Sequence, residues 1–336
     1  MKNQEKIFVI GHKNPDTDSI CSAIAYCDIK NRTTQESRYI PKRAGQINEE
    51  TEYVLNRFGV QPPGYLSNIG TQVKDMDIRL SPEANKSISL KNAWDLMQEN
   101  SIVSLPIREK DGTLEGLITI GDIAKTYMDT TDSYLLSRAR TQYQRIAETI
   151  GGKVIEGNAH GYFIQGKIMV ATANPDKMKE YVEENDMVIM GNREEDHLQA
   201  IEQNVSCIIV GMGIEVTEKV LKLAHEKEII IISSPYDTFT ISRLINQSIP
   251  VKYIMKTDNL VTFNTEDFTD DIQEVMIKHR HRAFPVINKK GKCIGTISRR
   301  NFLDMHRKKV VLVDHNEKDQ AVDNIDKADI MEIIDH

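Results

Sequence analysis

Three apolar runs constrain the fold most. One lies near the N-terminus of the chain and two lie about 300 residues later. Each run ends in acidic or imidazole side chains: residues 7–10 lead to His12, Asp16 and Asp18, residues 309–313 to Asp314 and His315, and residues 330–334 to Asp335 and His336. Their length and composition predict three buried strands. Because ligands of parallel sheets bind beyond the carboxyl ends of the strands, we expect these strand ends to meet in one cleft.

A repeat lies between these runs. The segment 94–124 matches a later segment without a gap, pairing Met97 with Met276, Pro106 with Pro285, Gly116 with Gly295, Thr119 with Ser298, and Asp122 with Asn301. Each copy predicts an amphipathic helix, a strand, a turn, a second strand and a second helix. Residues 134–250, between the copies, alternate strands with helices, which indicates a parallel α/β layer.

The economical interpretation is an α/β fold in which one parallel-sheet domain is interrupted by an insertion. We predict five segments: residues 1–66 and 309–336 form the two parts of the interrupted domain, residues 67–130 and 251–308 the two repeat copies, and residues 131–250 the middle α/β domain. The break Pro62-Pro63-Gly64 fits an insertion at an exposed loop.

Composition excludes several classes of function. The chain has 336 residues and a net charge of −7, which argues against a general binder of nucleic acid or of anionic membranes. Its four cysteines do not form a disulfide framework or a C-x-x-C pair. The sequence shows neither a signal peptide nor an apolar run of membrane-spanning length. We therefore expect a cytoplasmic protein.

The residues after the first run suggest a metal site. Several carboxylates crowded together repel one another unless cations lie among them. A set of imidazole and oxygen ligands suits Mn²⁺, Co²⁺ or Mg²⁺, and enough carboxylates for two ions indicates phosphoryl chemistry. The alternative is that Asp16 and Asp18 are turn residues and His12 lies on the surface. We expect Asp18 or Ser19 to cap the helix that follows.

The residue sequences of these motifs resemble those of a known family. Gly11-His12-Lys13-Asn14-Pro15-Asp16-Thr17-Asp18-Ser19, Val313-Asp314-His315-Asn316-Glu317 and Asp335-His336 resemble motifs of the DHH superfamily, and within it the family II manganese-dependent inorganic pyrophosphatases. The resemblance implies two Mn²⁺ or Co²⁺ ions per active site, and Mg²⁺ with the substrate pyrophosphate. It places His12 and Asp16 on one metal, Asp18 and His336 on the other, Asp314 between both, and His315 beside them as a polar catalytic group that is not a ligand.

The same resemblance limits what we expect of this chain. The family's motif continues Asp-His-His, whereas this sequence stops after the first histidine. We therefore expect a DHH domain truncated within its motif, and little or no hydrolysis by this chain alone.

The repeat copies resemble CBS domains, and the middle unit resembles a DRTGG domain with a degraded namesake pattern. The arrangement resembles nucleotide-regulated CBS pyrophosphatases, which implies a homodimer through the CBS and DRTGG domains. It also implies inhibition by AMP and ADP and activation by ATP or diadenosine polyphosphates. The nucleotide-binding residues implied or suggested by chemistry are Thr119, Asp122, Arg280, Thr296, Ser298, Arg299 and Asn301. The alternatives are that the arginines are solvated and that Thr119 and Asp122 only cap a helix.

Two other functions stay open from the sequence. One is a nucleotide-sensing module without catalysis. The other is a different DHH phosphoesterase, against which the Asn-Pro-Asp-Thr-Asp-Ser and Asp-His-Asn-Glu wording weighs.

Overall fold

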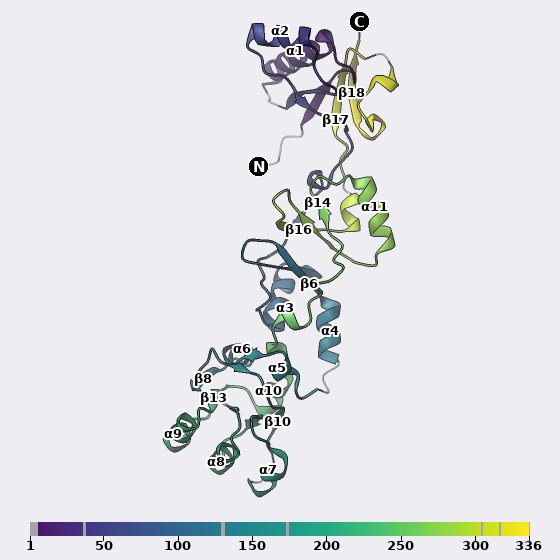
Figure 1. Cartoon of the computed structure of the whole chain (residues 1–336). Helices are drawn as coiled ribbons and strands as arrows, with labels where there is room; N and C mark the ends of the chain where they lie inside the picture. Colours follow the sequence, from purple (N-terminus) through teal and green to yellow (C-terminus); the bar gives the residue numbers. More distant parts are fainter. Residues whose placement is uncertain are drawn as a thin grey trace. The chain divides into compact units, whose positions relative to one another are not determined.

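The computed structural model describes residues 6–35, 38–128, 132–172, 175–303, 305–315 and 317–335. The chain forms two compact units, each assembled from separate segments of sequence (Figure 1). The first unit comprises Met1–Arg79, Phe263–Lys289 and Thr296–His336. The second comprises Leu80–Thr262 and Lys290–Gly295.

A five-stranded parallel sheet in the first unit joins the two ends of the chain. Its order is β18-β17-β1-β2-β3, and the strands are β1 (Ile7–Ile10), β2 (Tyr39–Arg43), β3 (Gly64–Tyr65), β17 (Lys309–Val313) and β18 (Asp329–Ile334). Ile7 pairs with Tyr39 on one side and with Lys309 on the other. Figure 1 shows the purple N-terminal elements beside the yellow C-terminal strands. The predicted interrupted parallel domain is confirmed. The prediction that residues 330–334 are a buried strand is wrong, because β18 lies at the edge of the sheet and all its residues are exposed.

Two helices accompany this sheet, α1 (Thr17–Thr34) and α2 (Glu49–Phe58). Ala23 and Cys27 of α1 pack with Val9 and Val311 in one apolar cluster. The cap expected at Asp18 or Ser19 is wrong, because the Asp16 carboxylate accepts a hydrogen bond from the Ser19 backbone N–H, 3.0 Å away, and so caps α1. The residue predicted to bind metal therefore also begins the helix.

The second repeat copy also belongs to the first unit for most of its length. It contains β14 (Phe263–Asn264), α11 (Thr269–Lys278), β15 (Phe284–Ile287) and β16 (Cys293–Ile297), in a sheet of order β14-β15-β16-β4 with β4 (Arg79–Leu80). Where a second helix was predicted, the described residues form a 3-10 helix, Arg299–Phe302. The chain has few residues left there before β17 begins.

The first repeat copy lies in the second unit and follows the predicted order. It contains α3 (Leu90–Glu99), β5 (Ser104–Arg108), β6 (Leu114–Thr119) and α4 (Ile120–Met128), and β5 pairs antiparallel with β6. Its core residues Leu90, Met97 and Leu105 form one cluster with residues of the middle domain such as Ile146 and Ile241.

The middle domain is the predicted α/β layer. Its sheet has the order β10-β11-β12-β13-β8, parallel except for β8; the strands are β8 (Lys153–Glu156), β10 (Ile168–Val170), β11 (Met187–Met190), β12 (Cys207–Val210) and β13 (Ile230–Ser233). The helices are α5 (Leu135–Arg138), α6 (Tyr143–Thr149), α7 (Pro175–Tyr181), α8 (Glu194–Glu202), α9 (Glu218–Glu226) and α10 (Thr238–Leu244), and a short pair joins β7 (Thr141–Gln142) to β9 (Tyr162–Phe163).

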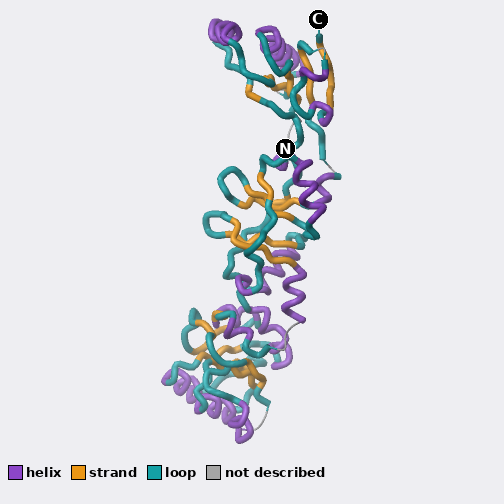
Figure 2. Tube along the Cα trace, turned by 45° about the vertical axis from the view of Figure 1, so that its right-hand side comes forward, coloured by secondary structure: helices purple, strands orange, loops and turns teal. Residues whose placement is uncertain are grey.

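Alternate residues of the middle strands face two separate cores. Val188 and Ile208 pack with Met178 of α7 and Val220 of α9, whereas Ile189 and Ile209 belong to the other cluster. This period of two is what a sheet covered on both faces requires. Figure 2 shows helices as purple tubes around the orange strands of this domain.

Candidate metal centre and nucleotide sites

Three predicted metal ligands meet at the carboxyl edge of the first sheet. His12 follows β1 and Asp314 follows β17, and these strands are parallel neighbours. The His12 Nε2 atom lies 3.3 Å from Asp314 Oδ2 and 3.8 Å from Asp16 Oδ1. One ligand atom from each of the three residues lies within 4.8 Å of the others. The ends of β1 and β17 thus meet at one edge of the sheet, as parallel-sheet geometry predicts.

The donor chemistry of this group fits a divalent cation. Asp314 Oδ2 is buried and makes no hydrogen bond, although the His12 ring is close to it. An unsatisfied buried carboxylate oxygen is costly, and a cation would satisfy it and offset the repulsion between Asp16 and Asp314. One imidazole and two carboxylates suit Mn²⁺, Co²⁺ or Mg²⁺.

The backbone of Asp314 is itself unusual. Its φ is +51°, in the left-handed region that aspartate and asparagine tolerate better than most residues. Its N–H donates to the carbonyl of Ile334 at 2.9 Å. The turn therefore directs the carboxylate back toward His12 while the backbone stays bonded to the end of β18.

Two other predicted ligands are not in this group. Asp18 lies in the first turn of α1, where one of its carboxylate oxygens accepts a hydrogen bond from the Ser22 hydroxyl at 2.8 Å. His336 lies outside the described residues. Metal binding by Asp18 and His336 stays a prediction.

His315 lies beside the group and is 5% exposed. Neither ring nitrogen has a hydrogen-bond partner among the described residues. Burial, with a smaller contribution from His12, lowers the pKa of His315 below its usual value. The ring is therefore neutral near pH 7 and can offer one donor and one acceptor.

The loop that carries His12 is held by contacts that sequence reasoning missed. The His12 backbone N–H donates to the Ser19 hydroxyl at 3.2 Å, and the Lys13 N–H donates to the Gln320 carbonyl at 2.8 Å. The Lys13 ammonium also pairs with Asp323 at 2.9 Å. Gly11, between the strand and the histidine, was the available signal, because a Cβ there would lie 1.9 Å from the Ser19 hydroxyl.

The two repeat copies place their hydroxyl residues alike. The Thr119 hydroxyl donates to an Asp122 carboxylate oxygen at 2.6 Å, and the Ser298 hydroxyl donates to Asn301 Oδ1 at 3.0 Å. The Asp122 N–H returns a bond to the Thr119 hydroxyl. Each pair thus organises a strand-to-helix junction whether or not a ribose binds there.

The remaining predicted nucleotide-binding residues differ in exposure and contacts. The Arg299 guanidinium donates to the backbone carbonyls of Met276, His279 and His281, so it stabilises the end of α11. Arg280 lies exposed in the loop that follows the helix, and Thr296 is buried in β16. Nucleotide contact by these residues stays a prediction.

Family models match most of the insertion. A CBS domain matches residues 79–129 and 251–308, and a DRTGG domain matches residues 145–248. A crystal structure of the CBS and DRTGG domains of the regulatory region of Clostridium perfringens pyrophosphatase, complexed with the activator diadenosine tetraphosphate, superimposes with a TM-score of 0.64 at 33% identity. The match covers 68% of this chain and all of that one.

Relatives among curated proteins extend the similarity beyond the insertion. A cobalt-dependent inorganic pyrophosphatase of Clostridium perfringens is 38% identical over 334 residues, and a probable manganese-dependent inorganic pyrophosphatase of Thermotoga maritima is 32% identical over 336 residues. These matches cover 99% and 100% of this chain but 60% and 61% of the relatives. The chain therefore spans about three fifths of their length. Among the described residues, no helix is both long and apolar enough to cross a membrane.

Proposed function

Since the chain belongs to the family of metal-dependent inorganic pyrophosphatases that carry CBS and DRTGG domains, we propose that it serves the hydrolysis of pyrophosphate to two phosphate ions. The observation that carries this proposal is the group of His12, Asp16 and Asp314 at the carboxyl edge of the parallel sheet. In this proposal, these three residues form part of the active site.

We propose Mn²⁺ or Co²⁺ as the resident ions, two per active site, with Mg²⁺ accompanying pyrophosphate. The relatives named for cobalt and manganese support this choice, and so does the mixed imidazole and carboxylate donor set. His12 and Asp16 would hold one ion, Asp18 and His336 the other, and Asp314 would serve both. Bound divalent ions would supply Lewis-acid activation of a phosphoryl group.

The chain's own residues have distinct tasks in this proposal. Asp314 orients its carboxylate through the left-handed turn, and the Ser19 hydroxyl fixes the backbone of His12. His315 is neutral and buried beside them, so it is suited to hydrogen-bond a phosphate oxygen or a water molecule without adding charge.

We propose that adenine nucleotides bind the CBS pair and regulate the enzyme. The structural relative with diadenosine tetraphosphate bound supports this, as do the matching junctions of Thr119 with Asp122 and Ser298 with Asn301. We also propose a homodimer formed through the CBS and DRTGG domains. We also propose the domain boundaries predicted from the sequence, residues 1–66, 67–130, 131–250, 251–308 and 309–336.

The test separates the metal site from the choice of substrate. Binding of Mn²⁺ to the 336-residue chain is measured by calorimetry for the wild type and for His12→Ala, which should bind much more weakly. Turnover by the full-length protein is then compared with pyrophosphate and with a dinucleotide as the substrate. Cleavage of the dinucleotide in preference to pyrophosphate would identify another phosphoesterase. A wild-type chain that binds no Mn²⁺ would contradict the metal site itself.

A further inference from the structure

A short connector, residues 66–75, joins the metal domain to the second CBS domain within the first unit. Its first half pairs with the metal domain, because the Leu66 N–H donates to the Arg43 carbonyl and the Ile69 N–H to the Asp323 carbonyl. Its second half pairs with the CBS domain, because the Val73 and Lys74 N–H groups donate to the carbonyls of Asp267 and Thr265. The connector thus bonds to two domains, and Gly70 lies between the part that bonds the metal domain and the part that bonds the CBS domain.

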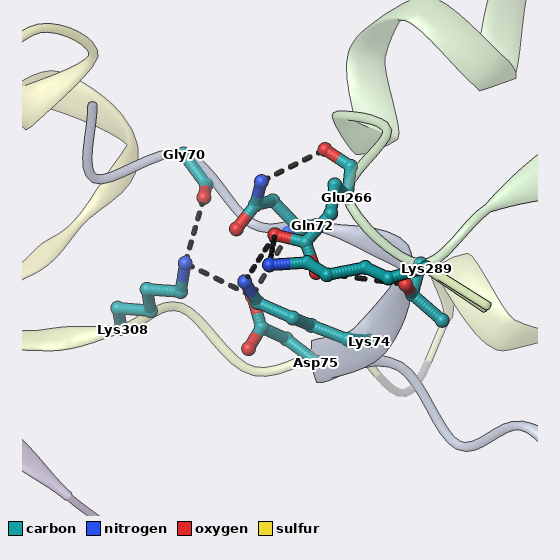
Figure 3. A network of polar contacts seen from close by, with 8 residues as sticks. Gly70, Gln72, Lys74, Asp75, Glu266, Lys289 and Lys308 are labelled. Carbon is teal, nitrogen blue, oxygen red and sulfur yellow. Dashed lines mark hydrogen bonds and ion pairs between the residues drawn. The ribbon is translucent and has the colours of Figure 1, made fainter. Parts of the chain in front are cut away.

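Lys308 contacts the connector at Gly70. It lies in the second segment that links the CBS domain to the metal domain, just before β17. Its ammonium donates to the Gly70 carbonyl at 2.9 Å and pairs with an Asp75 carboxylate oxygen at 2.9 Å (Figure 3). The side chain of Lys308 is 13% exposed and that of Asp75 is 28% exposed. Charge-assisted bonds in such a sheltered place are stronger than those at an open surface. We call the contact of Lys308 with Gly70 and Asp75 the lysine clasp.

The clasp continues into the second CBS domain. The same Asp75 oxygen that pairs with Lys308 accepts a hydrogen bond from the Gln72 N–H at 2.9 Å, and the Gln72 amide donates to the Glu266 carbonyl at 2.8 Å. The Glu266 carboxylate pairs with Lys74 and Lys289 (Figure 3). A displacement of the segment around Glu266 would therefore pull on Asp75.

Two routes lead from the clasp to the metal group. Lys308 directly precedes β17, whose other end is followed by Asp314. The connector also bonds Asp323 next to Gly70, and Asp323 pairs with Lys13, the neighbour of His12. Both routes are short: the first ends at Asp314, and the second ends at Lys13, next to His12.

Gly70 has little room to change. A Cβ there would lie 2.9 Å from the Asn68 side-chain oxygen and 3.2 Å from the Phe268 ring. The residue whose carbonyl Lys308 holds is therefore closely packed by the connector on one side and by the second CBS domain on the other.

We propose that the lysine clasp is the positioning device that couples nucleotide binding in the second CBS domain to the metal group. In the closed clasp, Lys308 and Asp75 hold β17 and the connector so that His12, Asp16 and Asp314 are gathered for metal. Nucleotide binding changes the fraction of molecules with a closed clasp, because a ligand shifts an equilibrium only through different affinities for its two states. By reciprocity, metal binding changes nucleotide affinity by the same factor. This inference rests on the proposed metal binding and nucleotide regulation.

The experiment measures coupling directly in the 336-residue chain. Calorimetry gives the Kd for Mn²⁺ with and without saturating diadenosine tetraphosphate, and the Kd for the nucleotide with and without Mn²⁺. We expect the two ratios to agree and to differ from one by about fivefold or more. Lys308→Met keeps the aliphatic stem and loses the ammonium, and Asp75→Asn keeps an acceptor and loses the charge. Each should reduce the ratio to less than about twofold, and the double variant should do no more than either.

Lys289→Met is the matched control, because it removes a lysine from the same network without touching Gly70 or Asp75. It should retain the wild-type ratio. Thermal unfolding tests whether each variant is folded, and Lys308→Gln takes the place of Lys308→Met if that variant is not. A wild-type ratio of one, with both ligands bound, would contradict the proposed regulation and with it the clasp. A wild-type ratio that survives in folded Lys308→Met and Asp75→Asn would overturn the clasp alone.

Discussion

The hydroxyl of Ser19, in the first turn of α1, accepts a hydrogen bond from the backbone N–H of His12 at 3.2 Å. The helix therefore fixes the position of the His12 backbone, and with it the imidazole, relative to the end of the sheet. Ser19 is 1% exposed, so water cannot replace this contact. The space for it exists because the preceding residue, Gly11, has no side chain.

Gly11→Ala should weaken metal binding by displacing this contact. The new methyl group would lie 1.9 Å from the Ser19 hydroxyl and 3.2 Å from the Ser19 carbonyl, so the strand end or the helix must move. Overpacking of this kind costs about 1–3 kcal/mol of stability. Calorimetry with Mn²⁺ and thermal unfolding measure both effects. Gly191→Ala, where a Cβ meets no atom within 4 Å, is the control and should change neither.

Asp314→Asn should lower Mn²⁺ affinity without disturbing the fold. Asparagine tolerates the left-handed backbone of this position, so the change isolates the loss of negative charge. We expect the Kd to rise by at least about tenfold, which corresponds to about 1.4 kcal/mol. Unchanged Mn²⁺ affinity in a folded variant would show that Asp314 is not a ligand.

Alanine variants of Arg299 and Arg280 should distinguish an arginine that stabilises the fold from one that contacts the nucleotide. Arg299→Ala removes the donor to three backbone carbonyls, one in the last turn of α11 and two just beyond it, and we expect a loss of about 1–3 kcal/mol of stability. Arg280→Ala should leave the unfolding temperature unchanged and weaken diadenosine tetraphosphate binding, since that side chain is exposed. Thermal unfolding and calorimetry of the two variants test this. Equal nucleotide affinity in Arg280→Ala and wild type would remove Arg280 from the predicted site.

Cys27 should remain an unreactive thiol in alkaline solution. It is 3% exposed on the buried face of α1, and burial raises its pKa to about 12. Because the unfolded thiol ionises near pH 8.5, stability from this group is complete below about pH 8.5 and is lost as the pH rises toward the folded pKa. Iodoacetamide at pH 9 should label Cys27 in urea but not in the native chain, as mass spectrometry can show. Rapid native labelling would mean that α1 detaches from the sheet.

The sequence allowed the sheet to be predicted better than the details at its edge. Residues 7–10 and 309–313 are continuous apolar runs, and a strand covered on both faces has that composition. The cap of α1 was misplaced because Asp16, Asp18 and Ser19 can all cap a helix, and only the backbone decides among them. The lysine clasp was missed because Lys308 and Gly70 are remote in sequence and neither belongs to a motif.

The register that places Lys309 beside Ile7 has a consequence for the order of folding. The chain must bring its two ends together to form β1 and β17, whereas β11, β12 and β13 pair with strands one helix away along the chain. Closing the larger loop costs more entropy, and distant pairing slows folding. Amide hydrogens of β12 should therefore gain protection early during refolding and those of β17 late, as pulsed hydrogen exchange can measure. The metal group would then be the last part of the chain to form, and an ion added during refolding would find no site until the inserted domains had folded.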